Sequence, residues 1–294
     1  MSCSACAGTA LVPHLTVTRD EARDLVPTID RYGHALSDIV RCTTCGHMQL
    51  ERFPSDEELA QAYAEAESED YVDEEPAQRE TARAVLSRVE RFSPVNGRIV
   101  DLGCWVGFLL DEARRRGWDP IGVEPSDYAS AYARDRLGLD IRQADILHAD
   151  LDHGTFDAVT MGDVIEHLIA PGETLDRIAA LLKPGGVVHI ATPNAGSALA
   201  RRMGARWWSV LPTHVQYFTR DSLRTLLEHH GFEVLFIGTQ PKTFSVRYYL
   251  WRIEGYSPAL SHAAIGAARA VGLADRLWTP DFRDRMAVVA RRPS

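Results

Sequence analysis

From about position 98 onward, two hydrophobic patterns alternate along this chain of 294 residues. Short apolar runs rich in β-branched residues predict buried strands. They are RIVDLGC, PIGVEPS, IRQAD, FDAVTMGD, VVHIATPN, FEVLFIGTQ and MAVVARR. Between them, apolar residues recur at helical spacing and predict helices over about 107–116, 127–137, 172–182 and 221–230. This alternation predicts an α/β fold with a parallel sheet, in which ligands bind at the carboxyl ends of the strands.

The first 97 residues follow a different pattern. Ser55 stands three residues before Glu58, a spacing that predicts a helix start with a capping box. A second helix is expected over about 76–92, ended by Pro94 and Gly97. Near the other end of the chain, residues 242–282 are expected to form an insertion with helices.

Composition narrows the class of protein. The chain is 45% hydrophobic and 25% charged, as expected of a globular protein. Its longest apolar runs fall short of the ~20 residues that a membrane span needs, and the N-terminus does not resemble a secretory signal. A cytoplasmic location without membrane contact is therefore expected.

The charge of the chain argues against a nucleic-acid partner. The formal net charge is -9, and acidic residues crowd between Glu65 and Glu75, where a solvated face or mobile segment is expected. The lysines are only Lys183 and Lys242. Such a balance repels phosphate backbones, although a local basic patch would reduce the repulsion.

Four of the five cysteines form two C-x-x-C pairs, Cys3/Cys6 and Cys42/Cys45. In a reducing compartment this spacing predicts a closed, structural Zn²⁺ site with four thiolate ligands. Two alternatives remain: unrelated free or redox-active thiols, and replacement of one ligand by the adjacent His47. The chain thus divides into a zinc-binding module (1–52), a helical linker or lid (53–95) and an α/β domain (96–294).

The stretch RIVDLGCWVG, at 98–107, carries the most specific chemistry. Asp101 ends the strand, and Gly103 and Gly107 follow in a turn that lets the backbone approach a ligand closely. The dinucleotide fingerprint G-x-G-x-x-G is absent, which disfavours a nicotinamide dehydrogenase. Glu124 and Asp145 follow at the ends of the next two strands, a spacing that fits two successive βα units.

The motifs DLGCWVG, VEPS, QAD, FDAVTMGDVIEHL and LKPGG together resemble those of class I S-adenosylmethionine-dependent methyltransferases over roughly 98–240 and the last strand. The resemblance implies a Rossmann-like, mostly parallel sheet of seven strands with helices on both faces, and it implies S-adenosylmethionine as cofactor. The CxxC-containing N-terminal part also resembles an arrangement found in small-molecule methyltransferases of natural-product and polysaccharide pathways.

The resemblance assigns one set of residues to the methionine end of the cofactor. Asp101 would accept from the ammonium group, directly or through water. Gly103 and Gly107 would leave room for the cofactor, and Gly162 and Asp163 would line the same end.

A second set of residues would bind the adenosine. Glu124 would accept from the ribose hydroxyls, and Asp145 from the adenine amino group, with Ile146 against the ring. Trp105 stands where the family usually has glycine. Its side chain either points away from the cofactor or forms part of the pocket wall, where the ring could attract the sulfonium.

Two histidines are candidate catalytic bases. His214, in LPTHVQYFTRDSL, follows the fifth strand of the domain and therefore belongs to the mouth of the site; packing or capping of the lid is the alternative role. His167 is the second candidate and would lie on the floor near the methyl group.

The function expected is methyl transfer to a small-molecule acceptor, most readily to oxygen, with carbon and nitrogen left open. Two alternatives remain: an RNA methyltransferase that grips rRNA or tRNA through the zinc module, and a non-enzymatic zinc- and cofactor-binding scaffold. A carrier protein for the acceptor and a homo-oligomer are possible partners.

Overall fold

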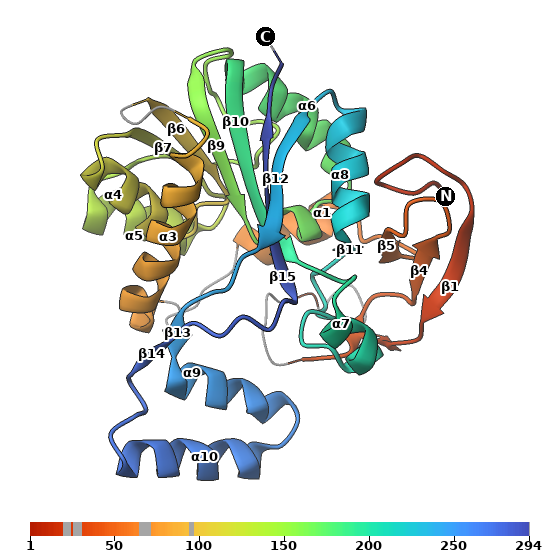
Figure 1. Cartoon of the computed structure of the whole chain (residues 1–294), viewed down its shortest axis with the longest axis vertical. Helices are drawn as coiled ribbons and strands as arrows, with labels where there is room; N and C mark the ends of the chain where they lie inside the picture. The colour runs from red at the N-terminus through yellow and green to blue at the C-terminus, as the bar shows by residue number, and fades with distance from the viewer. Residues whose placement is uncertain (20–24, 26–30, 65–71, 94–96, 294) are drawn as a thin grey trace.

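A computed structural model of the chain describes residues 1–19, 25, 31–64, 72–93 and 97–293. Its centre is a seven-stranded sheet in the order β12-β15-β10-β9-β6-β7-β8 (Figure 1). The strands are β6 (Arg98–Leu102), β7 (Asp119–Val123), β8 (Asp140–Arg142), β9 (Phe156–Gly162), β10 (Leu182–Pro193), β12 (Glu233–Thr239) and β15 (Arg285–Arg291). β15 runs antiparallel to both neighbours, whereas the pairs from β10 to β8 are parallel. The predicted seven-stranded, mostly parallel sheet is confirmed.

Helices cover both faces of this sheet because its strands are apolar on both sides. In β6, Ile99 packs with Val85 and Leu86 on one face, and the next residue, Val100, packs with Leu175 on the other. Figure 1 shows the helices on either side of the sheet. They are α3 (Glu75–Val89), α4 (Phe108–Arg115) and α5 (Asp127–Leu137) on one side, and α6 (Pro171–Leu181) and α8 (Arg220–His229) on the other.

The N-terminal segment forms a smaller sheet in the order β1-β4-β5-β11. Its strands are β1 (Leu11–Leu15), β4 (Ile39–Cys42), β5 (Met48–Leu50) and β11 (Gln216–Tyr217), and a separate pair is formed by β2 (Thr18–Arg19) and β3 (His34–Ala35). β11 lies far from β5 in the sequence, yet the two strands pair antiparallel. The cysteine-containing segment is therefore joined to the α/β body through a shared sheet.

Two helices lead from this segment into the main sheet. α1 (Asp56–Ala64) begins with the predicted capping box, in which Ser55 N donates to Glu58 Oε2 (2.8 Å) and Glu58 N to Ser55 Oγ (3.2 Å). α3 is fixed to α4 by Arg79, which is buried and donates to Asp111 and Glu112 at 2.7 and 3.1 Å.

The acidic run was expected to be a solvated face, and for Glu74 that prediction is wrong. Glu74 is buried and accepts from both the backbone N and the hydroxyl of Ser245, at 2.7 and 2.6 Å. Its carboxylate thus anchors the start of the insertion, which is a structural reason for an acid there. The earlier acids of the run, from Glu65 to Asp70, lie outside the described residues, as does Pro94.

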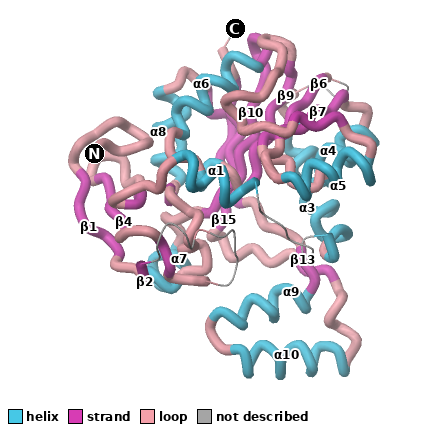
Figure 2. Tube along the Cα trace, turned by 180° about the vertical axis from the view of Figure 1, so that it is seen from behind, coloured by secondary structure: helices cyan, strands magenta, loops and turns pink. Residues whose placement is uncertain are grey.

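Residues 242–282 contain the helices expected of an insertion. They comprise β13 (Phe244–Ser245), α9 (Val246–Trp251), α10 (Pro258–Ala270) and β14 (Leu277–Trp278). In Figure 2, α9 and α10 are set off from the main sheet. The short helix α7 (Ala198–Met203) precedes β11. None of the helices in the described ranges combines the length and apolar character needed to cross a bilayer.

The tight turn after β6 leaves little room for a side chain at Gly107. Its φ is 83°, and a Cβ there would lie 2.6 Å from Leu139 Cδ1 and 3.2 Å from Ala133 Cβ. Gly138 also has a positive φ (61°), but a Cβ there meets nothing within 4 Å. We expect Gly138→Ala to lower the free energy of unfolding by about 1 kcal/mol, from the backbone alone. Gly107→Ala should cost about 1–3 kcal/mol more, because it also overpacks the turn.

Urea unfolding of the two variants checks this difference. Equal losses of unfolding free energy in the two variants would show that Leu139 and Ala133 can move to accommodate a methyl group. Close packing would then not require a glycine at position 107.

Candidate active site

The carboxyl ends of β6, β7 and β9 meet at one edge of the main sheet, and a cavity of about 1550 Å³ opens there. All of the sequence-predicted cofactor and catalytic residues line it. They are Asp101, Gly103, Trp105, Gly107, Glu124, Asp145, Ile146, Gly162, Asp163, His167 and His214. The cavity also reaches α1, α3 and the insertion, so segments from the whole length of the chain enclose it.

Trp105, at the position where glycine was expected, adopts a backbone conformation that favours glycine. Its φ is 49°, in the left-handed region that favours glycine, and Gly103 beside it has a φ of 74°. Trp105 N donates to Glu124 Oε2 at 2.8 Å, which helps to hold this disfavoured conformation. Trp105 is among the residues that line the cavity.

Two buried carboxyl groups lie at the ends of β6 and β7. Asp101 accepts from Thr160 Oγ1 at 2.7 Å, and burial raises the pKa of Asp101 to about 7. Glu124 accepts from the backbone N of Trp105 and of Ser126 (2.9 Å), yet burial still raises the pKa of Glu124 above its ordinary value. A cationic or hydrogen-bond-donating ligand in the cavity would stabilise the ionised form of both carboxyl groups.

Asp145 lies at the exposed rim. Its carboxylate accepts from the backbone N of Leu147 (2.9 Å) and His148 (3.2 Å) and contacts His148 Nδ1 at 2.7 Å. The turn after β8 therefore holds Asp145 in place, with Ile146 beside it in the wall. His148 was not singled out from the sequence, because a histidine three residues after an acid has many other roles.

At the end of β9, Asp163 forms ion pairs with Lys242 and Arg285. Burial alone would raise the pKa of Asp163, but the two cations outweigh it and hold that pKa well below its usual range. The φ of Asp163 is 57°, which makes Asp163 the second non-glycine residue after Trp105 to adopt a left-handed conformation in the cavity wall. A Cβ on the neighbouring Gly162 would meet nothing within 4 Å, so this backbone borders open space.

The two candidate bases, His167 and His214, lie against each other, with ring centroids 4.6 Å apart and the rings nearly perpendicular. Burial lowers the pKa of His167 to about 4 and holds the pKa of His214 well below its ordinary value. Both imidazoles are therefore neutral near pH 7. Glu166 completes this cluster, and burial raises its pKa to about 8.

Hydrogen bonds orient both rings. His167 Nδ1 lies 2.9 Å from the carbonyl oxygen of Thr213, which can only accept, so this contact favours the tautomer with the proton on Nδ1 and a lone pair on Nε2. His214 is hydrogen-bonded to the backbone of Ser209. The hydroxyl of Tyr63, from α1, also contacts His167 Nδ1. Tyr63 was missed because its partner lies 104 positions away.

Aromatic side chains form the wall opposite the sheet edge. Trp208, Tyr249 and Phe282 line the cavity, and the Trp208 and Phe282 ring centroids lie 5.8 Å apart. Trp207 belongs instead to a separate hydrophobic core, with its Nε1 3.3 Å from Asp284 Oδ2.

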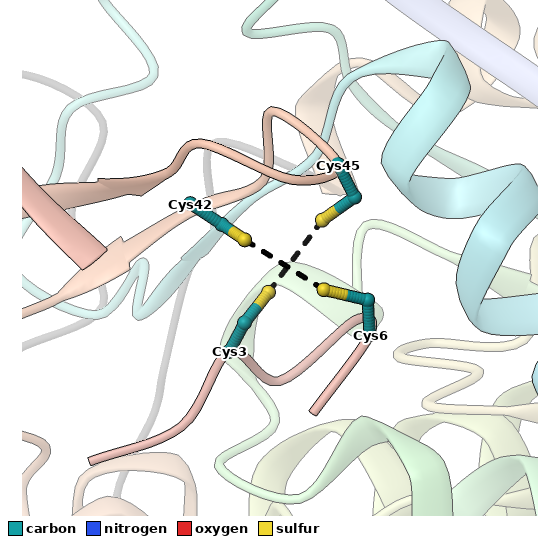
Figure 3. A group of neighbouring side chains, drawn as sticks. All are labelled: Cys3, Cys6, Cys42 and Cys45. Atoms are coloured by element: carbon teal, nitrogen blue, oxygen red, sulfur yellow. Dashed lines mark hydrogen bonds between the residues drawn. The ribbon is translucent and has the colours of Figure 1, made fainter. Parts of the chain in front are cut away.

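The four paired cysteines converge on one point, as Figure 3 shows. The Sγ atoms of Cys3 and Cys45 are 3.6 Å apart, as are those of Cys6 and Cys42. All four sulfurs lie within 4.8 Å of one another and are unlinked by disulfides. Four ligands at 2.3 Å in a tetrahedron would be about 3.8 Å apart, close to this spacing. His47 instead makes a hydrogen bond to Gln216, and Cys104 lies in the cavity wall.

A mostly parallel α/β sheet with a glycine turn and strand-end acids is typical of domains that bind nucleoside-containing cofactors. The family model described as "methyltransferase domain" matches residues 77–236, just over half of the chain. The chain belongs to this methyltransferase-domain family and carries the S-adenosylmethionine-dependent methyltransferase fold.

Curated relatives share part of this domain. The ubiquinone biosynthesis O-methyltransferase of Nitrobacter winogradskyi is 33% identical over 152 residues, which cover 47% of this chain and 57% of the relative. The protein of the same name from Rhodopseudomonas palustris strain HaA2 is 36% identical over 169 residues, covering 53% and 66%. This chain thus spans between 40% and 66% of the length of the curated relatives it matches.

Among solved structures, a chain from the complex between the Haloferax volcanii Trm112 methyltransferase activator and a methyltransferase has the same fold. It aligns with a TM-score of 0.52 at 16% identity and covers 75% of this chain and 94% of that one.

Proposed function

We propose that the chain binds S-adenosylmethionine at the carboxyl edge of the main sheet and transfers its methyl group to a hydroxyl of a small-molecule acceptor. The observation that carries this proposal is the pairing of two buried carboxyl groups, Asp101 and Glu124, with two neutral histidines in one cavity. The curated relatives, which are named O-methyltransferases, support oxygen as the acceptor atom. A natural-product or polysaccharide pathway is the context we propose.

The residues present fit the cofactor. Asp101 would accept from its ammonium group and Glu124 from its ribose hydroxyls, which would offset the cost of burying these carboxyl groups. The bare backbone of Gly162 leaves open space at the methionine end, beside Asp163. Asp145 and Ile146 at the rim are placed to meet the adenine.

The bound cofactor would supply a methyl group activated by its bond to a sulfonium, and transfer of that methyl to the acceptor oxygen would break the carbon–sulfur bond and leave a neutral thioether. The chain has then to hold the acceptor in line and take up the hydroxyl proton. His214 is the proposed base and His167 the second candidate; each neutral ring has one nitrogen whose lone pair can accept a proton. The aromatic wall would exclude water and bind the apolar part of the acceptor.

We further propose that Cys3, Cys6, Cys42 and Cys45 hold a structural Zn²⁺. The sulfur spacing supports this, as does the burial of Cys3 and Cys42. A closed four-thiolate site leaves no position for substrate, so the ion would act on the fold rather than on the methyl group.

An assay of S-adenosylhomocysteine release tests the activity. The purified chain is incubated with S-adenosylmethionine and, separately, with phenols, catechols, nucleotide sugars and total RNA. Turnover with a hydroxylated small molecule is expected. Methylation of RNA alone would overturn the proposed acceptor class.

The raised pKa of Asp101 predicts a pH-dependent affinity for S-adenosylmethionine. Below pH 7 this carboxyl is mostly neutral in the free protein, and an ammonium ligand favours the ionised form. The association constant should therefore rise about tenfold from pH 5.5 to pH 7. Calorimetry across this range measures the rise.

Asp101→Asn is the control. It removes the Asp101 carboxyl but leaves Glu166, whose raised pKa could also produce a pH dependence, so the variant separates the two contributions. The variant should bind more weakly and with a flatter pH dependence. An unchanged profile in the variant would remove Asp101 from the cofactor site.

Replacement of His214 separates chemistry from binding. We expect His214→Ala to lower turnover by about 100-fold or more, since a general base typically contributes that much, and to leave affinity for S-adenosylhomocysteine within about twofold. His229→Ala, an exposed histidine of α8, serves as the matched control. Wild-type turnover in His214→Ala would leave this residue a packing role.

Metal analysis tests the cysteine site. Wild-type protein should contain about one zinc per chain, and Cys42→Ser should lose most of it because a three-thiolate site binds the ion less tightly. Cys104→Ser should retain the metal, because Cys104 lies outside the cluster. Zinc-free wild type from zinc-supplemented cultures would contradict the assignment.

A further inference from the structure

Gln216 lies where the N-terminal segment meets the methyltransferase domain. It belongs to β11, pairs with Gln49 of β5 and is only 1% exposed. It follows His214 by two residues, so its strand continues directly from the loop that carries one candidate base.

The side chain of Gln216 makes hydrogen bonds both to the cysteine module and to the methyltransferase domain. On the module side, its Oε1 lies 2.8 Å from His47 Nε2 and its Nε2 donates to Ser4 Oγ at 3.2 Å. These partners belong to the two cysteine loops. On the domain side, Nε2 also donates to the carbonyl oxygens of Leu168 (3.0 Å) and Ile169 (3.3 Å).

The two segments that carry His167 and His214 are joined to each other by several hydrogen bonds. Thr213 O accepts from His167 Nδ1 (2.9 Å), and Val215 N donates to Glu166 O (2.9 Å). The third hydrogen bond of this series is the one from Gln216 Nε2 to Leu168 O. On the other side, Leu50 N donates to Val215 O at 3.1 Å. The segment from 213 to 217 is thus held between β5 and the turn that contains His167.

We propose that Gln216 is a positioning residue that couples the cysteine module to the His167–His214 pair. The module folds around its four cysteines, and β5 and Gln216 transmit that fixed geometry to the backbone on which both rings are mounted. This inference rests on the proposed function for the chemistry of the histidines, but the coupling itself is independent of the acceptor. A displacement of about 1 Å in such a pair can lower a rate about 100-fold.

Gln216→Met tests the coupling, because methionine keeps the volume and removes the hydrogen bonds. Gln49→Met is the matched control: Gln49 is also fully buried, but its amide contacts only Ser4 N (2.8 Å) and Ser2 O (3.1 Å) within the module, as far as the described residues show. Zinc content and calorimetric affinity for S-adenosylhomocysteine are measured on wild type and on both variants.

Hydrogen–deuterium exchange of the full chain, with S-adenosylhomocysteine present, supplies the main readout. In Gln216→Met we expect peptides covering 164–170 and 211–217 to exchange about 10-fold faster or more, with β9 and β10 unchanged and zinc retained. Gln49→Met should change only the N-terminal peptides. Unaltered exchange around the histidines in Gln216→Met would overturn the proposal, and so would uniformly faster exchange, which indicates a merely structural role.

Histidine ring spectra add a second signature. In ¹⁵N-histidine-labelled wild type, His167 should show the single Nδ1-protonated tautomer, and in Gln216→Met a mixture. A single tautomer in both proteins would count against the coupling. Loss of S-adenosylhomocysteine binding by wild type would instead overturn the proposed function, while exchange and ring spectra would still decide the role of Gln216.

Discussion

Burial of carboxyl groups at one edge of a parallel sheet is the constraint on which the rest of this site depends. Parallel strands deliver their carboxyl ends to the same edge, so Asp101, Glu124 and the Asp163–Glu166 segment must meet there. Cations of the chain neutralise Asp163, whereas burial raises the pKa of Asp101, Glu124 and Glu166. A cationic cofactor in this cavity would offset that cost, which gives a physical reason for its proposed binding there.

The cysteine module is built into the same site. Its sheet includes β11, and its buried Cys3 and Cys42 belong to one hydrophobic cluster with Phe218 and the main-sheet core. Its apolar residues Ile39 and Leu50 pack in a core shared with residues 195–217, and a metal held by four thiolates would add to the stability of the segment. Under this account, the module stabilises the wall that carries His214 and the turn that carries His167.

Local sequence patterns were sufficient for the main sheet, the capping box at Ser55 and the convergence of the cysteine pairs, because each depends on periodicity or short spacing. They were insufficient for contacts between distant segments. Tyr63 reaches His167 across 104 positions, and Arg285 reaches Asp163 across 122. Glu74 was assigned to a solvated run because its partner, Ser245, comes from the insertion. Trp105 keeps a glycine-like backbone through Glu124, a contact that residue type alone does not reveal.

The cavity at the edge of the main sheet is the proposed binding site of S-adenosylmethionine. Calorimetric titration of the purified wild-type chain with S-adenosylmethionine and with S-adenosylhomocysteine tests this proposal most directly. We expect both to bind at one site per chain, with micromolar dissociation constants. Absence of binding by both would contradict the proposal and would leave a metal-binding scaffold as the better description of the chain.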